Sequence, residues 1–208
     1  MPEAVTLNAP DGAALEGELT RAPGAPSAGM VLCHPHPQYG GSMRSIVIGA
    51  LFEALPPSGV TCLRFNFRGV EGSGGVYDEG RAERGDVATA VDRLATELGD
   101  TVPLVLAGWS FGADMALSVR DPAVSAWFAV APPFHFTIEL DELARDPRPK
   151  LFALAEHDEV RPAGETRAIV EGWDSTAVEV VAGASHFFVG RTDRLVELAR
   201  AFVARVAG

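Results

Sequence analysis

The chain has 208 residues, of which 47% are hydrophobic and 22% charged, a composition that is typical of a globular protein and excludes a disordered one. Its 17 basic and 28 acidic residues give a formal charge of −11, which argues against nucleic acid and membrane surfaces as partners. No run of about 20 apolar residues spans a bilayer, and no secretory leader or linker is evident, so we expect one cytoplasmic domain over residues 1–208.

The first predicted elements are an antiparallel hairpin and a buried strand. Residues 4–20 alternate around a Pro-Asp-Gly turn signal, which is typical of a hairpin at a sheet edge. Residues 29–33 form an apolar strand that ends in a loop of alternating histidine and proline over residues 34–37. Cys33 and Cys62 both lie in apolar runs without a C-x-x-C or other metal-binding spacing, so we expect two buried free thiols.

Two helices with a strand between them are predicted next. Residues 45–55 fit a helix that buries Ile46 together with two leucines, and residues 60–67 fit a central strand. The glycine-rich segment 68–75 lacks both common phosphate-binding patterns, so we expect a surface loop there. Apolar residues at helical spacing predict an amphipathic helix over residues 81–98.

Residues 103–112 join a buried strand, a sharp turn and the start of a helix around Ser110. Residues 104–107 are all apolar, as in a parallel strand that is covered on both faces. The next five residues, Gly-Trp-Ser-Phe-Gly, match the G-x-S-x-G nucleophile elbow. A chain with 22 glycines can contain this pentapeptide by chance, but the strand before it and the helix after it favour the elbow.

The remaining elements continue the alternation of strands and helices. Strands are expected over residues 126–131, 150–155 and 177–181, and helices over residues 162–172 and from about residue 195 to the C-terminus. The connection from Pro132 to Pro149 has only 18 residues, which leaves little room for a lid. The pattern predicts a doubly wound, mostly parallel α/β sheet that carries the N-terminal antiparallel hairpin.

Candidate reactive side chains follow three of the predicted strands. Parallel sheets bind ligands beyond the carboxyl ends of their strands, and Ser110, His186 and the acidic group Glu156, Asp158 and Glu159 all lie there. A serine hydroxyl is a weak nucleophile, so it needs a histidine as base and a carboxylate that orients that histidine. The elbow requires the chain order serine, acid, histidine, and each of the three acids meets it.

These motifs together resemble the α/β-hydrolase superfamily, in particular its small, lidless bacterial members of carboxylesterase-like or dienelactone hydrolase-like type. The similarity covers nearly the whole chain, and the matching segments are residues 34–37 with 40–42, 65–69, 108–112, Asp158 and 186–188. Glu71 and Ala155 depart from the pattern, because glycine is common at both positions in such proteins. The resemblance implies an α/β-hydrolase fold without a cap domain and favours Asp158 as the acid.

The expected activity is hydrolysis of carboxylic esters, of short chain length, by Ser110, His186 and Asp158 through an acyl-enzyme. Thioester hydrolysis and small amide or peptide hydrolysis remain alternatives, because the acyl-enzyme steps do not specify the leaving group. A non-catalytic binding protein on the same fold is a further alternative, since fold alone does not give function. A small-molecule ester is the expected partner, and no cofactor is implied.

Further residues of the site are predicted around Ser110. The oxyanion hole combines the N–H of Phe111 with one N–H from the histidine-proline loop, where Pro35 and Pro37 cannot donate. His36 is therefore the predicted second donor, with Gln38 or Tyr39 as alternatives. The predicted pocket residues are Tyr39, Trp109, Phe134, His135 and Phe136. His34 and His36 are two residues apart but have no third ligand nearby, so no metal site is predicted.

Overall fold

The computed structural model describes residues 1–208 and contains an eight-stranded sheet and six α-helices. The strands are β1 (Glu3–Asn8), β2 (Ala14–Thr20), β3 (Ala28–Cys33), β4 (Val60–Phe65), β5 (Leu104–Trp109), β6 (Val124–Val130), β7 (Lys150–His157) and β8 (Thr176–Ser185). The helices are α1 (Ile46–Ala54), α2 (Glu83–Leu98), α3 (Phe111–Leu117), α4 (Leu140–Arg145), α5 (Ala163–Val170) and α6 (Thr192–Ala207), with short 3-10 turns at Pro37–Tyr39 and Pro56–Ser58.

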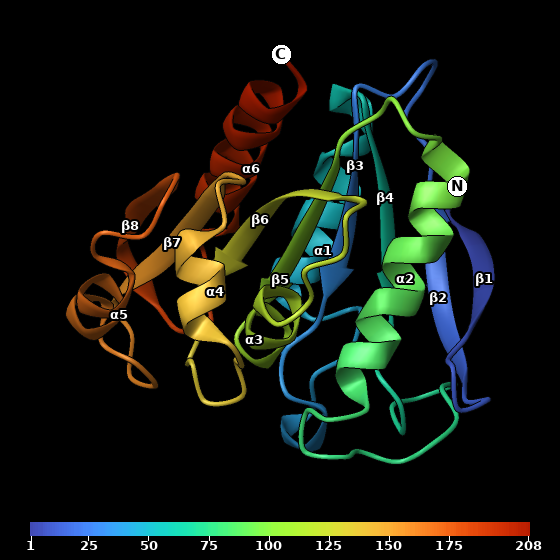
Figure 1. The fold of residues 1–208 in the computed structure, drawn as a ribbon, viewed down its shortest axis with the longest axis horizontal. Helices are drawn as coiled ribbons and strands as arrows, with labels where there is room; N and C mark the ends of the chain where they lie inside the picture. Colours follow the sequence, from blue (N-terminus) through green and yellow to red (C-terminus); the bar gives the residue numbers. More distant parts are fainter.

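The strand order in the sheet is β1-β2-β4-β3-β5-β6-β7-β8. The N-terminal hairpin of β1 and β2 pairs antiparallel with β4, and every later pair, from β4 through β8, is parallel. Figure 1 shows the hairpin at one edge and β8 at the other. The predicted fold class is confirmed, including the antiparallel hairpin at the edge.

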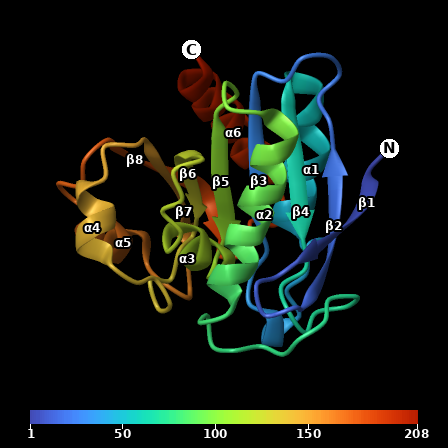
Figure 2. The same ribbon diagram turned by 45° about the vertical axis from the view of Figure 1, so that its right-hand side comes forward.

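Helices cover both faces of the sheet, which explains why its central strands are apolar at nearly every position. On β3, Met30 and Leu32 face the core beneath α1 and α6, whereas Val31 and Cys33 face the core beneath α2 and α3. This alternation follows from the two-residue period of a strand. Turning the molecule shows α2 and α3 on one side of β3–β5 and α1 and α6 on the other (Figures 1 and 2).

Element ends differ from the sequence-based expectation mainly on the C-terminal half of the sheet. β7 and β8 are longer than predicted, because they continue pairing past an irregularity and match His157 with Ser185. Residues 132–149 include the six-residue helix α4, and no cap domain is inserted there. None of the helices has the length and the apolar character needed to cross a bilayer.

The glycine-rich segment 68–75 forms turns, but its first residue is buried. The Arg68 guanidinium bonds the buried carboxylate of Asp86 at 2.6 Å, so the expectation of a simple surface loop is wrong for this side chain. Glu71 has a φ of 46°, a backbone conformation that favours glycine. Its carboxylate accepts from Arg44 at 2.7 Å and from Asn66 at 3.0 Å, and these bonds hold the strained turn.

Candidate active site

Ser110 lies in the tight turn between β5 and α3, in a backbone conformation that few residues adopt. Its φ is 55° and its ψ is −122°, and such a conformation costs about 1–3 kcal/mol unless the surroundings hold it. The N–H of Ser110 donates to the Val130 carbonyl of β6 at 2.9 Å. A Cβ on Gly108 would collide with the backbone of Gly112, and one on Gly112 with the backbone of Cys33, so the turn needs both glycines.

A chain of hydrogen bonds runs from Ser110 through His186 to Asp158. Ser110 Oγ is 3.0 Å from His186 Nε2, and His186 Nδ1 lies 2.9 Å and 3.0 Å from the two Asp158 oxygens. Since a carboxylate only accepts, Nδ1 carries the proton and Nε2 is left to accept from the hydroxyl. His186 is 4% exposed and Asp158 9%, so little water competes for these bonds. This arrangement can take a proton from a hydroxyl and stabilise the resulting imidazolium.

The register of β7 and β8 brings the acid and the histidine together. His157 pairs with Ser185, so Asp158 and His186 are the next residues after a matched strand pair. Asp158 Oδ1 also accepts the N–H of Arg161 at 3.0 Å, which fixes the carboxylate toward the imidazole. The sheet itself therefore determines the distance between the two side chains.

Side chains next to the three predicted residues hold the backbone of the histidine loop. Trp109 Nε1–H donates to the His186 carbonyl, and Glu159 Oε2 accepts the His186 N–H, both at 3.1 Å. Glu156 Oε2 accepts the N–H of Gly183 at 2.7 Å. Of the three acids that sequence reasoning considered, only the one at position 158 contacts the imidazole ring of His186.

His34 is buried at the end of β3, and both of its ring nitrogens bond to backbone. Nδ1–H donates to the Pro35 carbonyl at 2.6 Å, and Nε2 accepts the N–H of Phe67 at 3.0 Å. Burial lowers the pKa of His34 to about 4, so the ring is neutral. It has no lone pair left for a metal, and the structure holds no group of three or more histidine, cysteine or acidic side chains suited to one.

The loop after His34 places several N–H groups near Ser110, but most of them are engaged. The N–H of Gln38 donates to His36 Nδ1 at 3.2 Å, and the N–H of Tyr39 donates to the His36 carbonyl at 3.1 Å. The N–H of His36 itself makes no hydrogen bond. Phe111 is the first residue of α3, where a helix N–H has no intrahelical acceptor. Two free donors therefore lie on the two segments that flank Ser110.

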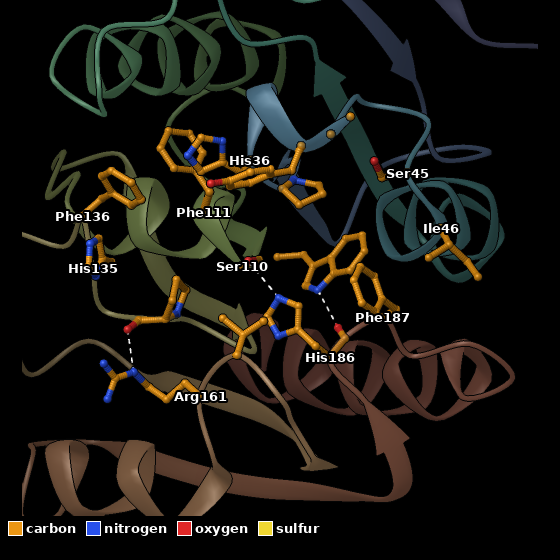
Figure 3. A pocket seen from close by; sticks show the side chains of 17 residues that line it. His36, Ser45, Ile46, Ser110, Phe111, His135, Phe136, Arg161, His186 and Phe187 are labelled. Atoms are coloured by element: carbon orange, nitrogen blue, oxygen red, sulfur yellow. Dashed lines mark hydrogen bonds between the residues drawn. The ribbon is translucent and has the colours of Figure 1, made fainter.

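An open cavity of about 640 Å³ surrounds Ser110. Its lining consists of Pro35, His36, Tyr39, Gly40, Gly41, Ser45, Ile46, Trp109, Ser110, Phe111, Pro133, His135, Phe136, Val160, Arg161, His186 and Phe187. In Figure 3, Ser110 lies between His135 and Phe136 on one side and Ile46 and Phe187 on the other.

Most of the predicted pocket residues line this cavity, and Phe134 does not. Tyr39 lies at the rim with 87% of its surface exposed, and Trp109, His135 and Phe136 contribute to the walls. Phe134 has a φ of 53°, which turns its ring away from the cavity and against Phe152 and Trp173, with ring centroids 6.0 Å apart in each case. The prediction for Phe134 is therefore wrong.

Other lining residues were missed by sequence reasoning. Ile46 was expected in the core, but it lies in the first turn of α1, is 44% exposed and faces the cavity. Arg161 donates from Nε to the Pro133 carbonyl at 2.6 Å and thereby joins the acid loop to the segment that carries His135 and Phe136. Phe187 follows His186 directly, and this position beside the predicted base was the only signal in the sequence that could have identified it.

The wall formed by His135 and Phe136 is attached to the helix that begins after Ser110. Asp114 on α3 is fully buried, and its carboxylate accepts the N–H groups of Phe134, His135 and Phe136 at 2.8–2.9 Å. Burial raises the pKa of Asp114, whereas these three donors favour its charged form. One short helix thus positions both the serine and this wall.

Comparison with known proteins places this architecture among hydrolases. No family model matches the chain. An uncharacterised protein of Rickettsia prowazekii is 32% identical over 205 residues, which cover 93% of this chain and 84% of the relative. An alpha-beta serine hydrolase homologue from Coxiella burnetii is 36% identical with a TM-score of 0.83, covering 96% of both chains. An α/β serine hydrolase without lid from Xanthomonas campestris is 26% identical with a TM-score of 0.81, covering 98% of this chain and 94% of that one.

The match with the Coxiella protein extends over nearly the full length of both chains and agrees with the sheet order, the elbow and the absence of a cap domain described above. The chain therefore belongs to the α/β-hydrolase superfamily, among the homologues of its serine hydrolases.

Proposed function

We propose that this protein hydrolyses carboxylic esters, with Ser110 as nucleophile, His186 as base and Asp158 as the acid that orients the histidine. The observation that carries the proposal is the unbroken chain of hydrogen bonds from the Ser110 hydroxyl to the buried carboxylate. The open cavity around the hydroxyl supplies room for a substrate. Ester hydrolysis is the chemistry that such a hydroxyl, imidazole and carboxylate perform most directly.

The reaction begins when Ser110 Oγ bonds to the ester carbonyl carbon and its proton passes to His186 Nε2. The carbonyl oxygen becomes an oxyanion, and we assign its two donors to the free N–H groups of Phe111 and His36. His36 is preferred over Gln38 and Tyr39, because the N–H groups of those two residues already have acceptors in the same loop.

The tetrahedral intermediate then collapses. The bond to the alcohol oxygen breaks, His186 returns its proton to that oxygen, and the acyl group remains on Ser110. Water next attacks the acyl carbon while His186 takes one of its protons, and the second collapse releases the carboxylic acid and restores the hydroxyl. Asp158 stabilises the imidazolium in both halves and stays ionised. Thioesters and small amides or peptides can follow the same steps, so a substrate panel decides between these classes.

The test is reaction with a fluorophosphonate probe together with hydrolysis of p-nitrophenyl acetate. We expect stoichiometric labelling of Ser110 and a loss of turnover of about 10⁶-fold in Ser110→Ala, by analogy with other serine hydrolases. Ser58→Ala is the matched control, because Ser58 is an exposed serine in the short turn before β4. Labelling of Ser110→Ala, or unchanged hydrolysis by it, would contradict the assignment. A wild-type protein that reacts with neither reagent would instead be a binding protein on this fold.

A further inference from the structure

Eight of the 17 residues that line the cavity carry an aromatic ring, and on the side of Ile46 the ring of Phe187 is half-exposed. On one side of Ser110 the rings pack against one another, with centroid distances of 5.0 Å for His36–Phe111 and 5.1 Å for Phe111–Phe136. Phe187, on the other side, is 52% exposed although it is a large apolar residue.

The surroundings of Phe187 explain its open position. Its ring meets the His186 ring at 89° with centroids 5.8 Å apart, and the Trp109 ring at 83° with centroids 6.4 Å apart. Both neighbours are therefore perpendicular to it, and neither stacks on it. Aromatic rings favour perpendicular or offset contacts at centroid distances of about 4.5–7 Å, so a further ring can be accommodated at the exposed part of Phe187.

The charge of the cavity restricts what such a ring may carry. Arg161 is the only Lys, Arg, Asp or Glu side chain in the lining. Its Nε donates to the Pro133 carbonyl at 2.6 Å and its Nη1 to the Glu165 carboxylate at 3.0 Å, so its charge is paired within the protein. The cavity thus favours an uncharged, apolar group.

The position of Phe187 relative to His186 indicates which part of the ester the ring belongs to. In the proposed reaction, His186 Nε2 gives a proton to the leaving alcohol oxygen, so this oxygen must come within about 3 Å of Nε2. A ring joined to the oxygen through one methylene group can then reach Phe187, whose ring centroid lies 5.8 Å from that of His186.

We propose that Phe187 binds an aromatic ring in the alcohol part of the substrate, so that the protein prefers esters of arylmethyl alcohols. This inference rests on the proposed ester hydrolysis. It assigns the leaving-group side of the cavity to Phe187, Trp109 and Ile46, and leaves the side of His135 and Phe136 to the acyl group.

The experiment compares benzyl acetate with cyclohexylmethyl acetate, two esters of similar size that differ in the aromaticity of the alcohol. The measured quantity is the ratio of kcat/KM for benzyl acetate to kcat/KM for cyclohexylmethyl acetate. We expect this ratio to be about three- to tenfold higher in wild-type protein than in Phe187→Leu. Phe187→Tyr keeps a ring and should retain the wild-type ratio. Val189→Ala is the control for lost apolar surface, because Val189 is 72% exposed in the same loop and lies outside the cavity lining.

The outcomes separate this inference from the proposed function. Equal ratios in wild type and Phe187→Leu would overturn the aromatic site. If kcat/KM fell by the same factor for both esters in Phe187→Leu, the aromatic site would also be overturned, because Phe187 would then only shield His186. In both cases fluorophosphonate labelling of Ser110 and hydrolysis of ethyl acetate would still hold. Absence of labelling and of all ester hydrolysis in wild-type protein would instead overturn the proposed function itself.

Discussion

His34 shows how a single buried residue fixes the loop that carries the proposed oxyanion donor. Its ring bonds the Pro35 carbonyl on one side and the Phe67 N–H on the other, and so joins the loop after β3 to the end of β4. The bond from Phe67 requires the neutral form of the ring, because Nε2 must accept. Protonation of His34 would therefore break the contact with Phe67 and place a charge in a site without solvent.

This arrangement predicts that stability falls in mild acid. Histidine has a pKa of about 6.5 in an unfolded chain, whereas burial lowers the pKa of His34 to about 4. Between these values the unfolded state binds a proton that the native state does not, so the unfolding free energy decreases as pH falls through this window, by about 2–3 kcal/mol. Urea unfolding at pH 7 and pH 4.5 measures the loss. His34→Gln should show a smaller loss over the same interval, and an equal loss in both proteins would contradict the prediction.

Motifs in the sequence identified Ser110 and His186, and the family resemblance favoured Asp158 among three acids, but neither indicated the contacts that orient these side chains. The elbow is a local pattern, and the order of serine, acid and histidine follows from the fold class. By contrast, the bond from Trp109 to the His186 carbonyl joins residues 77 positions apart, and no local rule predicts it. The error at Phe134 has a similar origin, because its positive φ depends on the Asp114 carboxylate that binds its N–H.

At the level of elements, hydrophobic periodicity predicts the order of strands and helices except for the six-residue helix α4, but it does not predict where the elements end. β7 and β8 extend beyond their apolar segments because each supplies the other with backbone partners up to His157 and Ser185. Polar residues such as Glu156 thus lie inside a strand. Helical periodicity correctly places Ile46 on a helix. It does not show that Ile46 is the first residue of that helix, where the side chain lines the cavity.

Asp158 and Glu159 in the loop after β7 both bond to His186 in the loop after β8, one to its ring and the other to its backbone N–H. We therefore predict different roles for these two neighbouring acids. Asp158→Asn should lose about 10⁴-fold in kcat, because an amide can reverse the tautomer of His186. Glu159→Gln should stay close to wild type, because it retains an acceptor for the His186 N–H. Glu159→Ala loses this bond and should lower kcat by about two- to tenfold with little change in KM. Steady-state kinetics with p-nitrophenyl acetate checks all three.

Glu179→Ala provides the matched control for charge, because the Glu179 side chain is exposed on β8 and makes no hydrogen bond or ion pair. If Glu159→Gln were as impaired as Glu159→Ala, the charge of Glu159 rather than its hydrogen bond would be the cause. If Glu159→Gln were more impaired than Asp158→Asn, the acid of the proposed reaction would have to be reassigned.

For the molecule as a whole, the feature that leaves the cavity open is the short connection between β6 and β7, which is anchored to the rest of the fold. Leu143 of α4 is fully buried in the core, and Asp114 holds residues 134–136 by three backbone bonds. The segment 132–149 is thus part of the packed body around the site. Nothing in it resembles an apolar flap that a lipid surface could displace.

This architecture predicts a preference for short acyl chains and no activation at an interface. Each additional CH₂ group is worth about 0.8 kcal/mol only when it is fully buried, and the open cavity of about 640 Å³ gives the distal part of a long chain no cover. We expect kcat/KM for p-nitrophenyl esters to be highest for acetyl or butyryl, to fall at octanoyl and to be lowest at palmitoyl.

We also expect the rate to rise smoothly as an ester passes its micellar threshold, because no lid has to open. Ser110→Ala at each chain length gives the background rate. A maximum at palmitoyl, or a sharp increase at the threshold, would show that the apolar rim formed by Tyr39, Val160 and Phe187 covers long chains in place of a lid.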